Sequence, residues 1–155
     1  MGSRCGRFLD FHEHESGRNG AVLYREYNLY SMSSIRPNEL ADRLDSDTDS
    51  DPFLLDIRPE RSFQSGAIEN SHNVAVYDDL RGGDDATLRR HLHDIPSDRD
   101  VVVICKMGVV AKRATSLLNE EGYDAVTLRG GMSGWRGYQN GSVSYKLRSL
   151  LWRLT

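Results

Sequence analysis

The 155-residue chain has only two cysteines and four prolines, and it contains no long apolar run. Two cysteines, Cys5 and Cys105, are too few for a disulfide-rich secreted scaffold. No apolar stretch is long enough to cross a bilayer, and the first residues lack the apolar core of a signal peptide. We therefore expect a cytoplasmic chain that folds without disulfide bonds and does not span a membrane.

The chain also lacks a large excess of charge of either sign, since 20 basic and 23 acidic side chains leave a net charge of −3. The basic residues predominate between Val101 and Thr155, where 8 of them accompany 3 acidic ones. This excess favours anionic substrates or an acidic partner, although an ordinary mixed surface explains the same counts. No run of basic and aromatic residues indicates binding to nucleic acid. We expect no nucleic-acid partner.

Residues 1–31 show neither the period of a strand nor that of a helix. Their glycines and scattered charges predict a disordered arm, or a stretch that precedes the natural start of translation at Met32. His12 and His14 by themselves make a poor metal site, so we predict no metal binding there. We divide the chain into this arm, a domain at 32–138 and a tail at 139–155.

Strand-like and helix-like segments alternate between Met32 and Tyr138. We predict strands at residues 35, 53–57, 73–76, 101–104 and 125–128. We predict helical segments at residues 37–44, 59–63, 87–93 and 110–121, a helix starting at 132–135, and a loop at 78–85. Ser34 is the expected cap of the first helix. Strands that alternate with helices predict an α/β fold, with a parallel sheet covered on both faces.

The tail carries four leucines at helical spacing, which are Leu147, Leu150, Leu151 and Leu154. They predict a short amphipathic helix at 144–154. We favour a helix that docks on the domain or on a second copy of it, because the segment is short. A helix lying on a membrane surface is the alternative. The protein is accordingly expected to be a monomer or a homodimer.

Cys105 follows the strand at 101–104 and precedes a loop with Gly108 and a helix. Crevices form at the carboxyl ends of parallel strands. The start of the next helix offers unsatisfied main-chain N–H groups, which together can stabilise a thiolate. Lys106, Lys112 and Arg113 add positive charge nearby. We predict a reactive nucleophile that needs no histidine base; a buried structural cysteine is the alternative.

Two long segments occur in a characteristic order, FLLDIRPERSFQSGAI (53–68) and VVVICKMGVVAKRATSLLNEEGYDAVTLRGGMSGW (101–135). On these motifs, residues 35–138 resemble the rhodanese family. The resemblance implies an open parallel sheet of about five strands. It also implies that Cys105 accepts sulfane sulfur from a small donor, thiosulfate or a persulfide, and passes it to a nucleophilic acceptor. No metal or other cofactor is implied.

The resemblance also assigns roles to other residues. The substrate would be held by the cysteine loop, Lys106, Met107, Gly108, Val109, Val110 and Ala111. Asp56 and Arg58 match the family's Asp-x-Arg signature and would support the loop or the neighbouring fold. Lys112 and Arg113 are expected to support the site through the positive charge that they add near Cys105. Gly131 and Trp135 match the closing motif of the family and are expected to serve packing.

The length of the loop separates two chemistries on this fold. Related phosphatases have one residue more and end the loop with an arginine, where this chain has Ala111, so sulfur is favoured over phosphate. Many members that use thiosulfate have an arginine at the position of Val110. Its absence argues against free thiosulfate and leaves open a binding module that docks a partner without turnover.

Two further motifs bear on the partner and on a neighbouring loop. The sequence CKMG resembles sulfurtransferase domains joined to ubiquitin-activating-like enzymes, which implies a sulfur-carrier protein as a candidate acceptor. Residues 67–71 read AIENS, where the family usually has His-Ile-Pro-Gly-Ala. We expect this departure to affect the geometry of that loop and not the fold.

Overall fold

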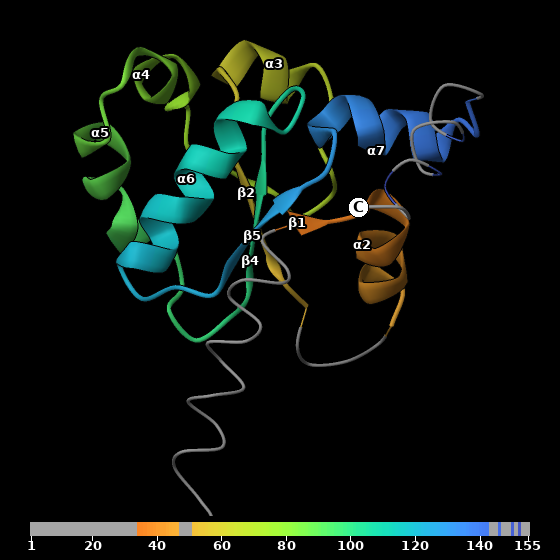
Figure 1. Ribbon diagram of the computed structural model, residues 1–155, viewed down its shortest axis with the longest axis horizontal. Helices are drawn as coiled ribbons and strands as arrows, with labels where there is room; N and C mark the ends of the chain where they lie inside the picture. Colours follow the sequence, from red (N-terminus) through yellow and green to blue (C-terminus); the bar gives the residue numbers. More distant parts are fainter. Residues whose placement is uncertain (1–33, 47–50, 143–145, 147–149, 151, 153–155) are drawn as a thin grey trace, which may run out of the picture. The chain divides into compact units, whose positions relative to one another are not determined.

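The computed structural model describes residues 34–46, 51–142, 146, 150 and 152, and it contains a five-stranded sheet (Figure 1). The strands are β1 (Ser34–Ile35), β2 (Phe53–Asp56), β3 (His72–Asn73), β4 (Val101–Ile104) and β5 (Ala125–Leu128). Their order is β1-β5-β4-β2-β3, and every neighbouring pair is parallel. The predicted α/β fold with a parallel sheet is confirmed.

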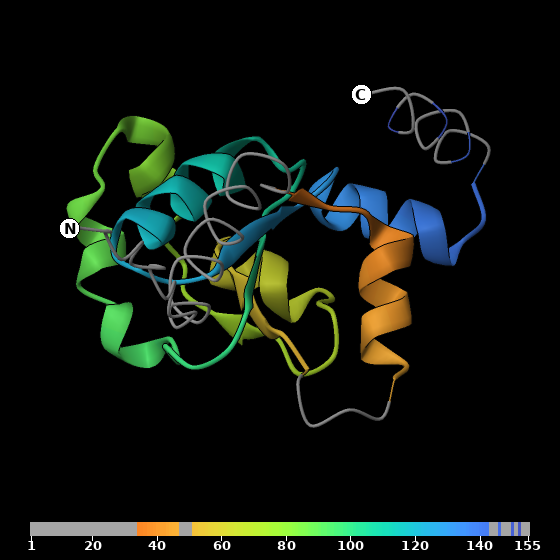
Figure 2. The same ribbon diagram turned by 60° about the horizontal axis from the view of Figure 1, so that its bottom comes forward.

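Helices cover both faces of this sheet (Figures 1 and 2). Their bounds are α2 (Pro37–Leu44), α3 (Glu60–Gln64), α4 (Tyr77–Gly82), α5 (Ala86–Arg89), the 3-10 helix η1 (Leu92–Asp94), α6 (Val109–Glu120) and α7 (Gly131–Gln139). Helices α4, α5 and α6 bury Leu80, Leu88 and Leu118 in one core cluster. On the opposite face, α2 and α7 bury Leu40 and Trp135 in a second cluster.

The central strand β4 lies between β5 and β2 and is buried on both faces. Val101 and Val103 belong to the cluster under α6, whereas Val102 and Ile104 belong to the cluster under α7. Four β-branched residues in a row suit such a strand, because neither face needs polar side chains. The strand ends at the carboxyl edge of the sheet, directly before Cys105.

The predicted loop at 78–85 is wrong, because helix α4 occupies Tyr77–Gly82. Its acidic and glycine-rich sequence hides one fully buried side chain, Leu80, which anchors the helix to the core. Asp78 and Asp79 lie in the first turn, where negative charge is favourable near the helix N-terminus. Gly83 ends the helix with a φ of 98°. Only the residues after it form the connection to α5.

Two other predicted elements are shorter or divided. The strand expected at 73–76 is reduced to β3, and Val74 and Val76 are buried without belonging to a strand. The helix expected at 87–93 is split into α5 and η1, because His91 takes a φ of −103° between them. These differences leave the order of the strands in the sheet unchanged.

The first helix begins at Pro37 as predicted, but Ser34 does not cap it. The main-chain N–H of Arg36 donates to the Glu39 carboxylate at 2.9 Å, which forms part of a capping box. The Ser34 hydroxyl instead accepts a hydrogen bond from Arg129 Nε at 2.8 Å, which ties β1 to the end of β5.

Several predictions concern residues that the structure does not describe. They include the arm at 1–31 with His12 and His14, and most of the tail helix at 144–154. Of the four tail leucines only Leu150 is described, and it is 56% exposed. The docking of the tail therefore stays a prediction. Within the described residues, no helix is both long enough and apolar enough to cross a membrane.

Candidate active site

Cys105 lies at the carboxyl end of β4, on the face covered by α6. The residue is only 1% exposed. Its Sγ accepts a hydrogen bond from the main-chain N–H of Gly108, with an N–Sγ distance of 3.1 Å. The sulfur is therefore recessed in the core, but it is contacted by a polar donor of the loop that follows it.

Gly108 makes this contact possible because it takes a φ of 82° immediately before α6. A Cβ at this position would lie 3.1 Å from both Gly130 N and Leu128 O. The turn thus needs glycine for its conformation and for the space around it. Helix α6 then begins at Val109, one residue before the predicted start, so the order of strand, cysteine, glycine loop and helix is as the sequence predicts.

The main-chain N–H groups around the sulfur are largely unused. Within the described residues, those of Lys106, Met107, Val109, Val110 and Ala111 have no main-chain acceptor. The first N–H groups of a helix carry partial positive charge and bind anions when they are free. The loop can therefore supply several donors to an additional sulfur atom and its negative charge.

The first residues of α7 bind main-chain carbonyls of the cysteine loop. Met132 N–H donates to the Cys105 carbonyl at 2.9 Å, and Ser133 N–H donates to the Lys106 carbonyl at 3.1 Å. Gly131 packs so closely that a Cβ there would lie 2.1 Å from the Cys105 carbonyl oxygen. The sequence indicated packing for Gly131, but its contact with the cysteine itself depends on the tertiary arrangement of two distant segments.

The predicted cations around the loop differ in their surroundings. Lys106 and Lys112 are exposed, and neither forms an ion pair within the described part of the chain. Arg113 is bound elsewhere, since its Nε lies 2.5 Å from Asp85 Oδ1 and its Nη2 donates to the Gly83 carbonyl. The hydrogen bond from Arg113 lowers the pKa of Asp85. Of the three predicted cations, the two lysines therefore stay without an ion pair among the described residues, whereas Arg113 does not.

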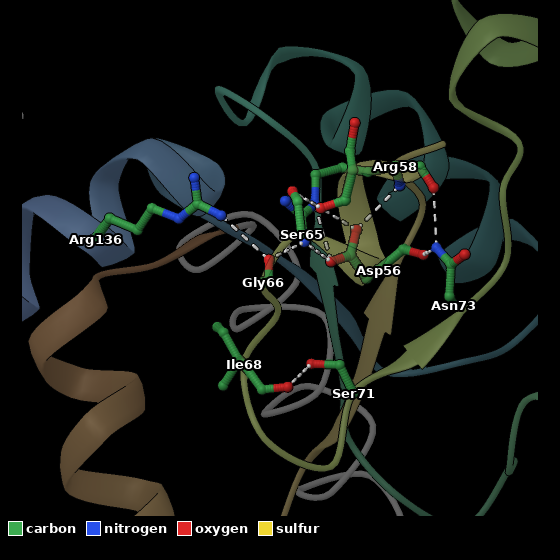
Figure 3. Close-up of polar contacts among 9 residues, drawn as sticks. Asp56, Arg58, Ser65, Gly66, Ile68, Ser71, Asn73 and Arg136 are labelled. Carbon is green, nitrogen blue, oxygen red and sulfur yellow. Dashed lines mark hydrogen bonds and ion pairs between the residues drawn. The ribbon is translucent and has the colours of Figure 1, made fainter. Parts of the chain in front are cut away.

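Asp56 and Arg58 form a buried ion pair at the end of β2 (Figure 3). Arg58 Nη2 lies 2.6 Å from Asp56 Oδ2, and Arg58 Nε lies 2.9 Å from Asp56 Oδ1. The side chain of Arg58 is 5% exposed and that of Asp56 is 0% exposed. Asp56 is paired in register with Ile104, the residue before Cys105. The ion pair thus fixes the strand end that borders the cysteine.

The same ion pair organises the loop between β2 and β3 (Figure 3). The Gly66 carbonyl accepts hydrogen bonds from Arg58 Nη2 at 3.0 Å and from Arg136 Nη2 at 3.3 Å. Asn73 Nδ2 donates to the carbonyls of Asp56 at 2.7 Å and Arg58 at 2.9 Å. The sequence analysis placed Asn73 in a strand and missed this role. An amide side chain between His72 and Val74 gave no distinct signal for it.

Asn70 shapes the turn where the sequence departs from the family pattern. It has a φ of 58°, the left-handed conformation that glycine adopts most readily. Ser71 N–H donates to the Ile68 carbonyl at 3.2 Å and closes the turn. Asn70 therefore occupies the position at which the family usually has glycine, and asparagine is the residue that tolerates this conformation best after glycine.

Two residue patterns that would indicate other chemistries are missing from the described part of the chain. Ala111, at the position of the phosphatase arginine, is fully buried in the core under α6. Within the described residues, no group of three or more histidine, cysteine or acidic side chains is arranged to hold a metal ion.

Replacing Asp56 with asparagine is expected to reduce the free energy of unfolding by about 3 to 5 kcal/mol, because Arg58 would keep a buried charge without its counterion. Urea unfolding at neutral pH measures the change. The matched control is Glu39→Gln, which removes the charge from the half-exposed ion pair with Arg36 but retains a capping side chain. An equal loss in the two variants would contradict the assigned importance of the buried pair.

Comparison with protein families identifies the fold family directly. A model of the rhodanese-like domain matches residues 36–138. The chain belongs to the rhodanese family. The match includes β2 with its ion pair, the cysteine loop and α7. It leaves the arm and the tail outside the family domain.

Curated relatives of this rhodanese-like chain carry sulfurtransferase names. A sulfurtransferase from Allochromatium vinosum is 30% identical over 105 residues, which cover 67% of this chain and 88% of the relative. A thiosulfate sulfurtransferase from Shewanella oneidensis is 31% identical over 83 residues, covering 53% of this chain and 73% of the relative. An adenylyltransferase and sulfurtransferase from Zea mays is 33% identical over 89 residues, which cover 56% of this chain and 18% of that longer protein.

Solved structures share the fold. The rhodanese-related protein from Thermoplasma volcanium aligns with a TM-score of 0.55 and 24% identity, covering 70% of this chain and 93% of that chain. The rhodanese-like domain protein from Staphylococcus aureus aligns with a TM-score of 0.56 and 24% identity, covering 67% of this chain and 91% of that chain. These likenesses extend over the family domain and agree with the five-stranded parallel sheet described above.

Proposed function

We propose that this protein is a sulfurtransferase that carries sulfane sulfur as a persulfide on Cys105. The observation that supports this proposal most strongly is the hydrogen bond of 3.1 Å from Gly108 N–H to Sγ at the start of α6. A sulfur that receives a main-chain donor beside a helix N-terminus is stabilised as an anion. The names of the relatives point to the same reaction class.

The reaction proceeds in two displacement steps. The Cys105 thiolate attacks the outer sulfur of a sulfane donor, the sulfur–sulfur bond of the donor breaks, and the donor leaves with the electron pair. Sulfite leaves from thiosulfate, and a thiolate leaves from a persulfide. A nucleophilic acceptor then attacks the terminal sulfur on Cys105 and regenerates the thiolate. The main-chain N–H groups of residues 106–111 hold the charge of the bound sulfur in both steps.

The proposed catalytic unit is the domain at 32–138, acting in the cytoplasm as a monomer or homodimer. The substrate-binding residues are Lys106 to Ala111, with Asp56, Arg58 and Lys112 in supporting roles. Arg113 supports the connection between α4 and α5 through Asp85 rather than the loop itself. A sulfur-carrier protein is a candidate acceptor, given the resemblance of the CKMG loop to domains of that kind.

Incubation of the full chain with a sulfane donor is expected to add one sulfur atom to Cys105, and a thiol or cyanide is expected to remove it. Intact-mass spectrometry follows both steps, and peptide mapping distinguishes Cys105 from Cys5. Because Cys105 carries the proposed chemistry, sulfur that never appears on it after donor treatment would refute the proposal. Reductant treatment of the loaded protein serves as the control for covalent persulfide.

A binding module without turnover is the second candidate, and the 1% exposure of Cys105 is the observation that favours it. A recessed sulfur could accept one atom from a small donor and yet stay inaccessible to a larger acceptor. The same experiment separates the two candidates, because a binding module would load but would not release its sulfur to cyanide, a thiol or a carrier protein.

A further inference from the structure

Two large apolar side chains of the cysteine loop face solvent. Met107 is 48% exposed and Val109 is 73% exposed. They flank Gly108, whose N–H donates to the sulfur of Cys105. Among the described residues the only other exposed large hydrophobic side chain is Leu150. We call Met107 and Val109 the apolar rim. The apolar rim therefore lies directly beside the donor that contacts the Cys105 sulfur.

Positive charge borders the apolar rim, but no free guanidinium does so among the residues that the sequence assigned to the site. Lys106 and Lys112 are exposed and unpaired within the described ranges. Arg58 and Arg113 are held by Asp56 and Asp85. Thiosulfate is a small hydrated dianion, which an arginine fork would bind well and an apolar rim does not bind at all. The surface suits a ligand with both apolar and acidic groups.

The recessed sulfur sets a second requirement. Because Cys105 is 1% exposed, a donor must present its sulfur on a slender arm. A cysteine persulfide provides one, since its outer sulfur lies about 2 Å beyond the thiol sulfur. The peptide that carries this cysteine would stay at the surface, where its neighbouring side chains meet the apolar rim and the two lysines.

We propose that the donor for Cys105 is a persulfide on a cysteine of a protein segment whose neighbouring residues are apolar and acidic, and that Met107 and Val109 determine this specificity. The inference rests on the proposed sulfur transfer. The Cys105 thiolate attacks the outer sulfur of the donor, the S–S bond of the donor breaks, and its cysteine leaves as a thiolate. The hydrogen stays on the transferred sulfur, so the step needs no oxidant or reductant.

Three short synthetic peptides with a central cysteine persulfide test the proposal on the full chain. The cysteine is flanked by apolar and acidic residues in the first, by serine and asparagine in the second, and by apolar and basic residues in the third. Intact-mass spectrometry gives the initial rate of sulfur arrival on the protein. We expect the first peptide to load Cys105 about tenfold faster than the second, because contact with the rim buries apolar surface. The third should be slower than the first, since its charge opposes Lys106 and Lys112.

Variants of the rim locate the preference. In Met107→Gln/Val109→Gln the ratio of the rates with the first and second peptides should fall close to one. Both side chains are exposed in the native protein, so the fold should persist, and circular dichroism checks this. The matched control is Leu150→Gln, which changes an equally exposed apolar side chain of the tail and should keep the tenfold ratio.

Several outcomes would overturn the inference. Equal rates for the first two peptides, or faster loading from thiosulfate than from any peptide, would do so while leaving the proposed sulfur transfer intact. If the native protein is a dimer by light scattering and the rim variant is a monomer, a second copy covers the rim and the inference fails. Absence of loading from every donor would remove the proposed function as well.

Discussion

Replacing Cys105 with serine is expected to lower the rate of sulfur transfer by at least about a thousandfold. A serine hydroxyl fits the space of the thiol, but it cannot form the sulfur–sulfur bond that holds the transferred atom. The rate is measured with a sulfane donor and cyanide, and the bound sulfur is measured by intact mass. Because the side chains are similar in size, circular dichroism should show an unchanged fold.

The control for this variant is Cys5→Ser, which changes the only other cysteine of the chain. It should transfer sulfur at the rate of the native protein, because Cys5 precedes the family domain. Transfer by Cys105→Ser at a rate near that of the native protein would show that the chemistry does not depend on Cys105. In that case the hydrogen bond from Gly108 to Sγ has no catalytic meaning.

Replacing Gly131 with alanine is expected to reduce the free energy of unfolding by about 3 kcal/mol. Its φ of 53° is unfavourable for alanine, and the new methyl group would lie 2.1 Å from the Cys105 carbonyl oxygen and 2.9 Å from Gly108 N. The loop must therefore move away from α7. In molecules that still fold, loading of Cys105 with sulfur should also slow, since the moved atoms include the donor to Sγ.

Gly141 offers a matched control for this variant. Its φ of 57° is nearly the same, but a Cβ there would meet no atom within 4 Å. Gly141→Ala should therefore cost only about 1 kcal/mol, from the backbone conformation alone. Urea unfolding of both variants isolates the steric contribution at the cysteine loop. Equal losses would mean that the loop and α7 separate without penalty.

The sheet and the position of Cys105 between a strand and a helix were predictable because their signals are local. Val101–Ile104 is a run of β-branched residues, and Gly108 and Gly122 mark the start and end of the next helix. Helix α4 was missed because its sequence is acidic and glycine-rich, and a single buried Leu80 gives no periodic pattern. In the sequence, the glycine and aspartate content of this segment predicts a loop. In the folded chain, the burial of Leu80 anchors the same segment as a helix.

The surroundings of Cys105 were predictable only in part. A helix start after the cysteine indicated main-chain donors, and Gly108 provides one of them. The near-complete burial of the thiol and the contact with Gly131 depend on how α6 and α7 pack, which no local pattern encodes. The same holds for Asn73, whose amide bonds two carbonyls at the end of a strand far from it in the sequence.

The hydrogen bonds from Met132 and Ser133 to the carbonyls of Cys105 and Lys106 bear on how this protein can be shortened or split. A fragment that stops after β5 would keep Cys105 and the five strands of the described sheet, but it would lose the N–H groups that bind the Cys105 and Lys106 carbonyls. Two halves expressed separately, divided between β5 and α7, should accordingly regain reactivity only when they reassemble. A fragment meant to keep the conformation of the cysteine loop should therefore include α7.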